Sequence, residues 1–369
     1  MSVGEIQKKQ QTDMSVIDLS KQGRQKLRSR RYREASTLFL QGLGREPENP
    51  YLLSGLGDAS REMGNFDIAE SCYQKLLKLD EKNLFALRGL GDVYKKLGRH
   101  ADAISMWERY LKLRRRDKHV MSRIADSAKV LSQFERAEEM YLSILAFAPD
   151  DRFALTGLAD LQHRLGKDHD AIRIYEKILS YDGNGLHILT ILGKLCWRIS
   201  DFDRAEVYFR RALEVDPRNP YALYGLGNCH RWNRRYQQAI EVWQKILEDS
   251  EGTQALHTRM GDAYYHIDRK QEAAESYHRS ISFGRDPFSM AGLICLSVDT
   301  KDMDTAIDTF FDLVVTDADP LFQLDMLSRR FERAGQKNMM QAFYRQLLQL
   351  DSPDRKLGDD LAAAIEKLC

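Results

Sequence analysis

The sequence has few cysteines, no excess charge of either sign and no long apolar run. Its five cysteines are odd in number and lack paired spacing, which excludes a disulfide framework and fits a reduced, cytoplasmic chain. Lysine and arginine total 56 and aspartate and glutamate total 55, so attraction to a nucleic-acid backbone does not dominate. We find no signal-peptide core and no membrane-spanning stretch, and therefore expect no membrane contact.

Motifs for catalysis, cofactors and metals are also missing. Gly55-Leu56-Gly57 resembles the start of a dinucleotide-binding loop, but no strand precedes it and Ser60 stands where the third glycine belongs. No paired-cysteine zinc spacing or His-Glu-x-x-His arrangement occurs. The sequence therefore predicts no enzyme activity, no cofactor and no metal site.

What the sequence does contain is a period of thirty-four residues. An alanine recurs at this interval eight times, at Ala35, Ala69, Ala103, Ala137, Ala171, Ala205, Ala239 and Ala273. Four residues after each comes an aromatic residue: Phe39, Tyr73, Trp107, Tyr141, Tyr175, Phe209, Trp243 and Tyr277. An apolar residue followed by a small one, such as Leu90-Gly91, precedes each alanine from the second onward. One small unit is therefore copied along the chain.

Within each period the apolar residues recur at helical spacing, as in Leu87, Leu90 and Tyr94, and no sustained strand pattern occurs. Eleven residues separate the small pair from the alanine, enough to end one helix, turn and begin another. Turn residues are expected at Gly64, Gly98, Ser132, Gly166, Ser200 and Gly335. Small residues allow two helices to cross closely, and the aromatic rings fill the space between one pair and the next.

These residues resemble the tetratricopeptide repeat, with its Leu-Gly pair, alanine, aromatic residue and terminal proline (Pro47, Pro149 and Pro217). The resemblance covers about Val16 to Pro353 and implies an all-α, right-handed α-solenoid superhelix with first helices lining the concave side. Repeats are expected to start near residues 16, 50, 84, 118, 152, 186, 220, 254, 287 and 321. The array then occupies 16–354, after a polar, disordered segment at 1–15 and before a C-terminal capping helix at 355–369.

Two repeats depart from the pattern. The ninth slips by one residue, at Ala306 and Phe310, and the tenth has Met340 where alanine is expected. The ninth also carries an apolar run, Phe288, Met290, Leu293 and Ile294, which we interpret either as core or as a surface for self-association.

The candidate binding surface is the face of the first helices that remains once the packing residues are removed. Its residues are Tyr51, Phe85, Asp92, Lys95, His119, Asp126, Lys129, Phe153, Asp160, Arg164, His187, Lys194, Trp197, Arg198, Tyr221, Tyr224, Asn228, Arg231 and Trp232. In one interpretation the rings wedge against the next repeat and the charges neutralise one another along each helix. In the other, the face binds a segment of a partner protein, a common use of open solenoid grooves.

Repeats five to seven hold the expected main anchor. Trp197, Tyr221, Tyr224 and Trp232 are interleaved there with Arg198, Arg231, Arg234 and Arg235, residue types enriched at binding hot spots. With Phe153, Arg164 and His187 they would bind an acidic or aromatic-containing peptide. The sequence thus predicts a non-enzymatic interaction scaffold whose protein or peptide partner it does not identify.

Two alternatives stay open at this point. The first is a nucleic-acid or ribonucleoprotein-associated protein that uses the basic first repeat, with its Lys21, Arg24, Lys26, Arg28, Arg30, Arg31 and Arg33. We regard nucleic acid as the lesser expectation, since such a stretch is commonly a solvated helix face. The second is a regulatory subunit whose catalytic partner is a separate chain.

Overall fold

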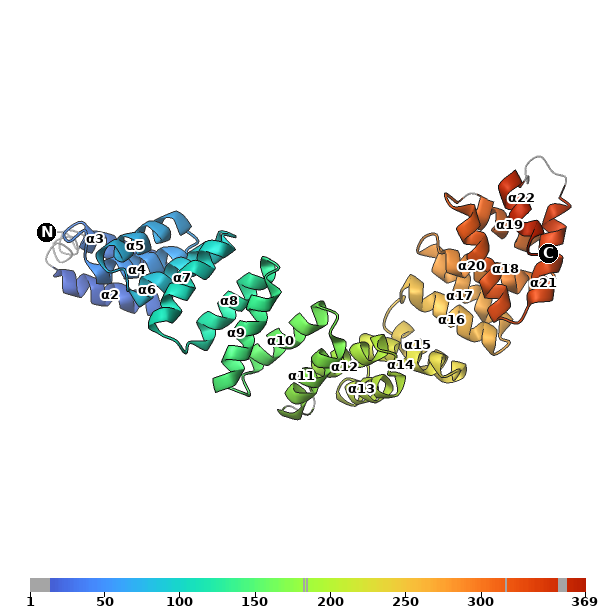
Figure 1. Ribbon diagram of the computed structural model, residues 1–369, viewed down its shortest axis with the longest axis horizontal. Coiled ribbons are helices and arrows are strands. Elements are labelled where there is room, and N and C mark those ends of the chain that lie inside the picture. The colour runs from blue at the N-terminus through green and yellow to red at the C-terminus, as the bar shows by residue number, and fades with distance from the viewer. Residues whose placement is uncertain (1–13, 182, 184, 316, 351–356) are drawn as a thin grey trace, which may run out of the picture. The chain divides into compact units, whose positions relative to one another are not determined.

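The computed structural model describes residues 14–181, 183, 185–315, 317–350 and 357–369 (Figure 1). Throughout these residues the regular structure is helical and contains no strand, so the all-α prediction is confirmed. Residues 1–13, where most of the expected disordered segment falls, lie outside the described residues, as do the last residues of the expected array.

The chain divides into two compact units, the first ending at Ile178 and the second beginning at Leu179. Helix pairs of the first unit are α2 (Val16–Arg28) and α3 (Tyr32–Leu43), α4 (Pro50–Glu62) and α5 (Phe66–Leu79), α6 (Leu84–Lys96) and α7 (His100–Leu113), α8 (Lys118–Val130) and α9 (Phe134–Phe147), α10 (Arg152–Arg164) and α11 (Asp168–Tyr181). The last helix of this series runs three residues past the division.

The second unit continues the same alternation. Its pairs are α12 (Leu186–Arg198) and α13 (Phe202–Val215), α14 (Pro220–Trp232) and α15 (Tyr236–Leu247), α16 (Gln254–His266) and α17 (Lys270–Ser282), α18 (Pro287–Thr300) and α19 (Met303–Phe310), α20 (Pro320–Arg333) and α21 (Lys337–Leu348). A π-helical turn, η1 (Phe311–Val315), follows α19, and α22 (Asp359–Glu366) ends the series with Leu361 and Ile365 buried.

Helix ends follow the period of the sequence. The residue that turns the chain between the two helices of a pair has positive φ, as predicted for Gly64, Gly98, Ser132, Gly166, Ser200 and Gly335. The same register in the other repeats holds Arg30, Arg234, Asp268 and Lys301, which have φ between 57° and 63° although each carries a side chain. These four turns were not predicted. Arginine and lysine do not mark such a conformation in a sequence, whereas Asp268 is a small polar residue of the kind that does and was overlooked.

The core consists of the periodic residues. All eight periodic alanines and all eight aromatic residues that follow them are at most 2% exposed. In the Leu90-Gly91 pair, a Cβ added to Gly91 would come within 2.6 Å of Cδ1 of the buried Trp107 ring, which confirms that this position needs a small residue where helix and ring meet. In the tenth repeat Met340 fills the alanine place and is 1% exposed.

The apolar run of the ninth repeat belongs mainly to the core. Met290, Leu293 and Ile294 are buried, and only Phe288 is open to solvent, with 60% of its surface exposed. Self-association through this repeat stays a prediction, and of the run only Phe288 is available for it.

Within each unit, first helices of neighbouring repeats pack against one another. This holds for α2 with α4, α4 with α6 and α8 with α10, and in the second unit for α12 with α14, α16 with α18 and α18 with α20. The first helices therefore form the more closely spaced layer, and we call the surface they turn to solvent the first-helix face. Each helix in the described part of the chain is too short or too polar to traverse a bilayer.

Candidate functional site

The ring at the second position of repeats two to seven lies on the first-helix face. Tyr51, Phe85, Phe153 and Tyr221 are between 64% and 83% exposed, so they are not wedged into the core. His119 and His187, at the same position, are also exposed. A cation from the preceding repeat covers part of two rings: Arg24 lies 5.6 Å from the centre of Tyr51, and Lys194 lies 4.8 Å from that of Tyr221. These rings are open to a ligand.

Most ninth-position aspartates, by contrast, already have a partner inside their own repeat. The buried tyrosine fifteen residues later donates its hydroxyl to the carboxylate, from Tyr73 to Asp58 at 2.7 Å and from Tyr141 to Asp126 at 3.1 Å. Tyr175 and Asp160 form the same bond, as do Tyr277 and Asp262 at 3.0 Å. We did not foresee this role, although the constant spacing of aspartate and tyrosine was visible in the sequence.

Asp92 has no tyrosine partner, because its repeat carries Trp107 instead. Two arginines from the neighbouring repeats reach it, Arg61 at 3.4 Å and Arg123 at 2.6 Å. Burial raises the pKa of the Asp92 carboxyl above its ordinary value, and the two guanidinium groups oppose that shift. The carboxylate therefore links three successive first helices, a role that leaves it little capacity for a ligand.

The basic residues of the first unit are also engaged. Lys129 lies 3.4 Å from Asp126 on its own helix, whereas Lys95 reaches the same carboxylate from the preceding repeat at 3.7 Å. Arg164 covers the ring of Phe134, 5.1 Å from its centre. Pairing along one helix is thus confirmed, and pairing between repeats is added by the structure.

Repeats six and seven build an aromatic corner. Trp197 meets Phe202 edge to face at 4.8 Å and Trp232 at 6.2 Å, while Phe202 lies against Trp232 at 4.4 Å between ring centres. Trp232 keeps 56% of its surface exposed, and Trp197 is partly exposed. The corner therefore combines fixed ring orientations with open apolar surface.

The contact of Phe202 with Trp232 is one case of a recurring arrangement. A residue in the last turn of a first helix covers the ring that begins the second helix of the preceding repeat, thirty residues earlier. Arg164 does so on Phe134, and His266 stacks on Tyr236 at 4.5 Å. The position of Trp232 is thus structural, whereas the exposed part of its indole exceeds what this packing needs.

The three rings of this corner line an open hollow of about 600 Å³. The lining residues are Lys194, Trp197, Arg198, Ser200, Phe202, Phe209, Tyr221, Tyr224, Gly225, Asn228, Trp232 and Arg259. The hollow thus brings together seven residues predicted from the sequence, and adds Phe202 and Arg259, which were missed. It contains three cationic residues and no acidic one.

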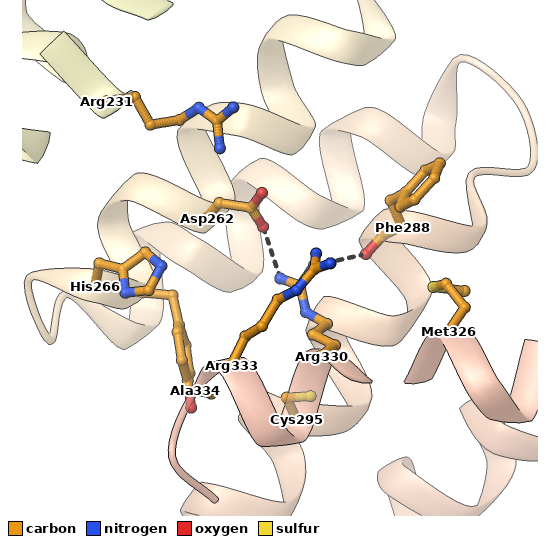
Figure 2. A pocket seen from close by; sticks show the side chains of 10 residues that line it. Arg231, Asp262, His266, Phe288, Cys295, Met326, Arg330, Arg333 and Ala334 are labelled. Carbon is orange, nitrogen blue, oxygen red and sulfur yellow. Dashed lines mark hydrogen bonds and ion pairs between the residues drawn. The ribbon is translucent and has the colours of Figure 1, made fainter. Parts of the chain in front are cut away.

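The four predicted arginines after Trp197 and Tyr221 do not all reach this hollow. Arg198 lines it, but Arg235 bonds to the buried carboxylate of Glu206 and Arg234 forms a left-handed turn. Arg231 lines a second hollow, of about 210 Å³, with Asp262, His266 and Arg330 (Figure 2). Arg231, Arg234 and Arg235 thus do not line this hollow with the aromatic residues, because successive residues of a helix point in different directions. The role of Arg231 in binding a partner stays a prediction.

In the second hollow, Arg330 links α20 to the preceding repeats. Its guanidinium donates to Asp262 at 2.6 Å, to the Tyr277 hydroxyl at 2.7 Å and to the Phe288 carbonyl at 3.4 Å. Figure 2 shows Arg231 and Arg333 projecting toward the same space. Since Arg330 is committed to three acceptors of the protein, we assign it a structural role.

The basic first repeat is partly neutralised. Lys26 lies 2.6 Å and Arg31 lies 3.8 Å from the single carboxyl group of Glu34, and Arg24 covers Tyr51. The His, Cys, Asp and Glu side chains of the described residues do not gather into a group that could hold a metal ion.

Comparison with known protein families finds the same repeat family in three parts of the chain. Residues 48–116, 154–185 and 192–252 each match a model of the tetratricopeptide repeat. Stress-induced-phosphoprotein 1 of Caenorhabditis elegans is 25% identical over 98 residues, a match that covers 25% of this chain and 31% of that protein. The aligned part is thus about a third of the relative's length.

Solved structures that resemble the chain include the following two. The C-terminal part of a TPR repeat-containing protein from Cytophaga hutchinsonii has a TM-score of 0.54 and 16% identity, covering 64% of this chain and 97% of that chain. A structure of Naa15/Naa10 bound to HypK-THB has a TM-score of 0.50 and 14% identity, covering 95% of this chain and 54% of that chain. At such identities the likeness establishes the fold alone.

Proposed function

Because the chain is a tetratricopeptide repeat protein, we propose that it is a non-catalytic scaffold that binds a segment of a partner protein on its first-helix face. Proteins built of this repeat generally mediate protein–protein interactions. A stack of helix pairs offers a long surface whose exposed side chains are free to vary while the packing residues stay constant.

The observation that carries the proposal is the hollow of repeats six and seven. Aromatic side chains and arginine are the residue types that most often dominate binding energy, because they bury much area and still form hydrogen bonds. Here Trp197 and Trp232 present apolar surface beside Arg259 in one hollow of about 600 Å³. That volume falls within the range of about 300–1,000 Å³ typical of ligand sites, so it holds a few side chains of a bound segment.

The remainder of the first-helix face favours peptide binding less strongly. In the first unit Asp92 and Asp126 are committed to arginine, lysine and tyrosine partners from the protein itself. The exposed rings of Tyr51, Phe85 and Phe153 offer additional contacts there. The anchor that we propose lies entirely in the second unit, where the aspartates of repeats six and seven are replaced.

The experiment uses the intact chain and a displayed library of random twelve-residue peptides. The most enriched peptide is then titrated by calorimetry into the wild type and into the Trp197→Ala and Trp232→Ala variants. Each truncation should weaken binding by about 1–3 kcal/mol, the usual cost at an interface hot spot.

Val207→Ala serves as the matched control, because Val207 is apolar and 53% exposed on α13 but does not line the hollow. Its affinity for the peptide should equal that of the wild type. If no peptide is enriched, or if both tryptophan variants bind as well as the wild type, the proposed anchor is wrong.

A further inference from the structure

One guanidinium in the hollow lacks the carboxylate that its counterpart has elsewhere in the chain. Arginine stands at the sixth position of a repeat at Arg123 and at Arg259, and each side chain reaches back thirty-one residues to the preceding first helix. Arg123 meets the carboxylate of Asp92 at 2.6 Å. Arg259 meets the neutral amide oxygen of Asn228, also at 2.6 Å. The two contacts share one register and one length, but the acceptor is a carboxylate at the first site and a neutral amide at the second. Arg61 also reaches Asp92, whereas Trp197 stands at the equivalent position before Asn228.

No other group in the described chain replaces that charge. Arg259 forms no ion pair there, and the ring of Tyr224 lies 4.9 Å below its guanidinium. Burial lowers the pKa of Arg259, and the nearby Arg231 lowers it further, whereas Tyr224 and Asp262 act against the shift. Asp262 is itself bonded to Arg330 and Tyr277. A partly buried cation beside a second cation favours the binding of an anion.

The repeat that precedes the one containing Asn228 also lacks the ninth-position aspartate, and it has a cation there. Lys194 occupies the ninth position, where Asp58, Asp92, Asp126, Asp160 and Asp262 stand in other repeats. Two successive ninth-position carboxylates are therefore missing, and one is replaced by a cation. These two positions line the same hollow, and no acidic residue lines it with them. The absence of negative charge is local to this hollow, since the chain as a whole carries a net charge of only +1.

We propose that the ligand of this hollow is an acidic peptide whose carboxylate binds Arg259 where Asn228 has replaced an aspartate, with a neighbouring large apolar side chain against Trp197 and Trp232. This inference rests on the proposed function and specifies the chemistry of the bound segment. The carboxylate oxygens accept from the guanidinium, and the Asn228 amide nitrogen can donate to the same group. The apolar side chain covers the exposed part of the aromatic corner.

A peptide fits these features better than a nucleic acid does. A single strand carries a phosphate at every nucleotide and is bound along a continuous basic track. Here the ninth-position aspartate is absent from only two successive repeats, and the next repeat has Asp262 at that position. The basic surface is therefore too short for such a track. A carboxylate on a side chain and one at a chain end share the required chemistry, so the experiment includes both.

The decisive variant is Asn228→Asp, which supplies the missing charge from the protein. Aspartate is the residue at this position in five other repeats, so the variant should fold, as far-UV circular dichroism will verify. Its new carboxylate should pair with Arg259 as Asp92 pairs with Arg123. An acidic peptide selected on the wild type should then bind at least about tenfold more weakly, because the ligand loses a charge-assisted contact and meets a like charge.

A second variant and a control complete the set. Arg259→Gln should lower the affinity for the same peptide at least about tenfold, because it removes the cation directly. Asn65→Asp makes the same change of net charge at an exposed residue of the first unit and should leave affinity unchanged. The probe is the most enriched peptide of the random library, made with a free or an amidated C-terminus and with its acidic side chains as carboxylates or as amides.

The outcomes separate the two proposals. The inference is supported if the enriched peptides carry an acidic residue near a large apolar one. Both variants should then bind these peptides more weakly, and binding should be lost when the carboxylates are converted to amides. Peptides that need Trp197 but show no acidic preference, or that bind the Asn228→Asp variant as well as the wild type, overturn it and leave the scaffold proposal standing. If no peptide is enriched, or if only a single-stranded oligonucleotide binds the hollow, both proposals fall.

Discussion

Replacing Gly227 by alanine should destabilise the second unit, although alanine is the better helix former. Gly227 lies on α14 directly against the indole of Trp243 on α15, which is fully buried. An added Cβ would lie 2.5 Å from Cδ1 of that indole, closer than real contacts allow. The indole Nε1 also donates to the Tyr224 carbonyl at 3.3 Å, so the ring cannot shift without weakening this hydrogen bond.

The expected magnitude follows from opposing terms. Alanine gains about 1 kcal/mol of helix propensity over glycine. Overpacking a close-packed site costs about 1–3 kcal/mol, and loss of the indole hydrogen bond costs about 0.5–1.5 kcal/mol. The balance is a net loss of about 0.5–3.5 kcal/mol in the free energy of unfolding.

Gly57→Ala is the matched comparison. It has the same register but faces Tyr73, whose nearest ring atom would lie 2.8 Å from the new Cβ. Alanine occurs naturally at this register at Ala125 and Ala159, opposite the tyrosines Tyr141 and Tyr175. We therefore expect Gly57→Ala to cost less than Gly227→Ala.

The assay is urea unfolding followed by far-UV circular dichroism, with amide hydrogen exchange to locate the effect. Repeat arrays can unfold in parts, so exchange protection should fall mainly in α14 and α15. If Gly227→Ala raised the free energy of unfolding, or if the two variants behaved alike, the steric reasoning would be refuted.

Two further predictions concern charged groups of the second unit. Asp262→Ala removes the carboxylate to which both Arg330 and the Tyr277 hydroxyl donate, and it should lower the free energy of unfolding, measured in urea, by about 1.5–3 kcal/mol. A wild-type value would contradict the assigned role. Burial raises the pKa of the Asp286 carboxyl, but hydrogen bonds from Ser289 and two other residues outweigh it and hold that pKa below its ordinary value of 3.8. The folded state thus binds fewer protons near that value, and the stabilisation is lost as the pH falls below about 4. In acid titrations monitored by circular dichroism the stability gap between the wild type and Asp286→Asn should therefore narrow as the pH falls, and a constant gap would show that Asp286 has no such role.

Much of the fold could be predicted from the sequence, because packing between helix pairs imposes the same demands in every repeat. A ring such as Tyr73 needs a small residue opposite, so both leave a mark at fixed spacing. Turns at Arg234 and Lys301 escaped prediction, since those residue types adopt positive φ only where the flanking helices require it.

The candidate site was predicted less completely. Helical periodicity placed Trp197, Tyr221 and Asn228 on one face, and the structure brings them into one hollow. Helical periodicity did not show that Arg259 joins them from the next repeat, because a contact over thirty-one residues depends on how successive first helices lie side by side. Nor did it show that Arg231 lines a different hollow.

The sequence by itself determined the repeated helix pair, its core residues and the face that each first helix presents, since these depend on periodicity within thirty-four residues. Only the tertiary structure decided which charges on that face are already neutralised. Asp92 and Asn228 hold equivalent places, yet one completes an ion pair with Arg123 and the other leaves Arg259 without a carboxylate. The physical reason is that electrostatic interactions act over distances in space, and the partners come from different repeats.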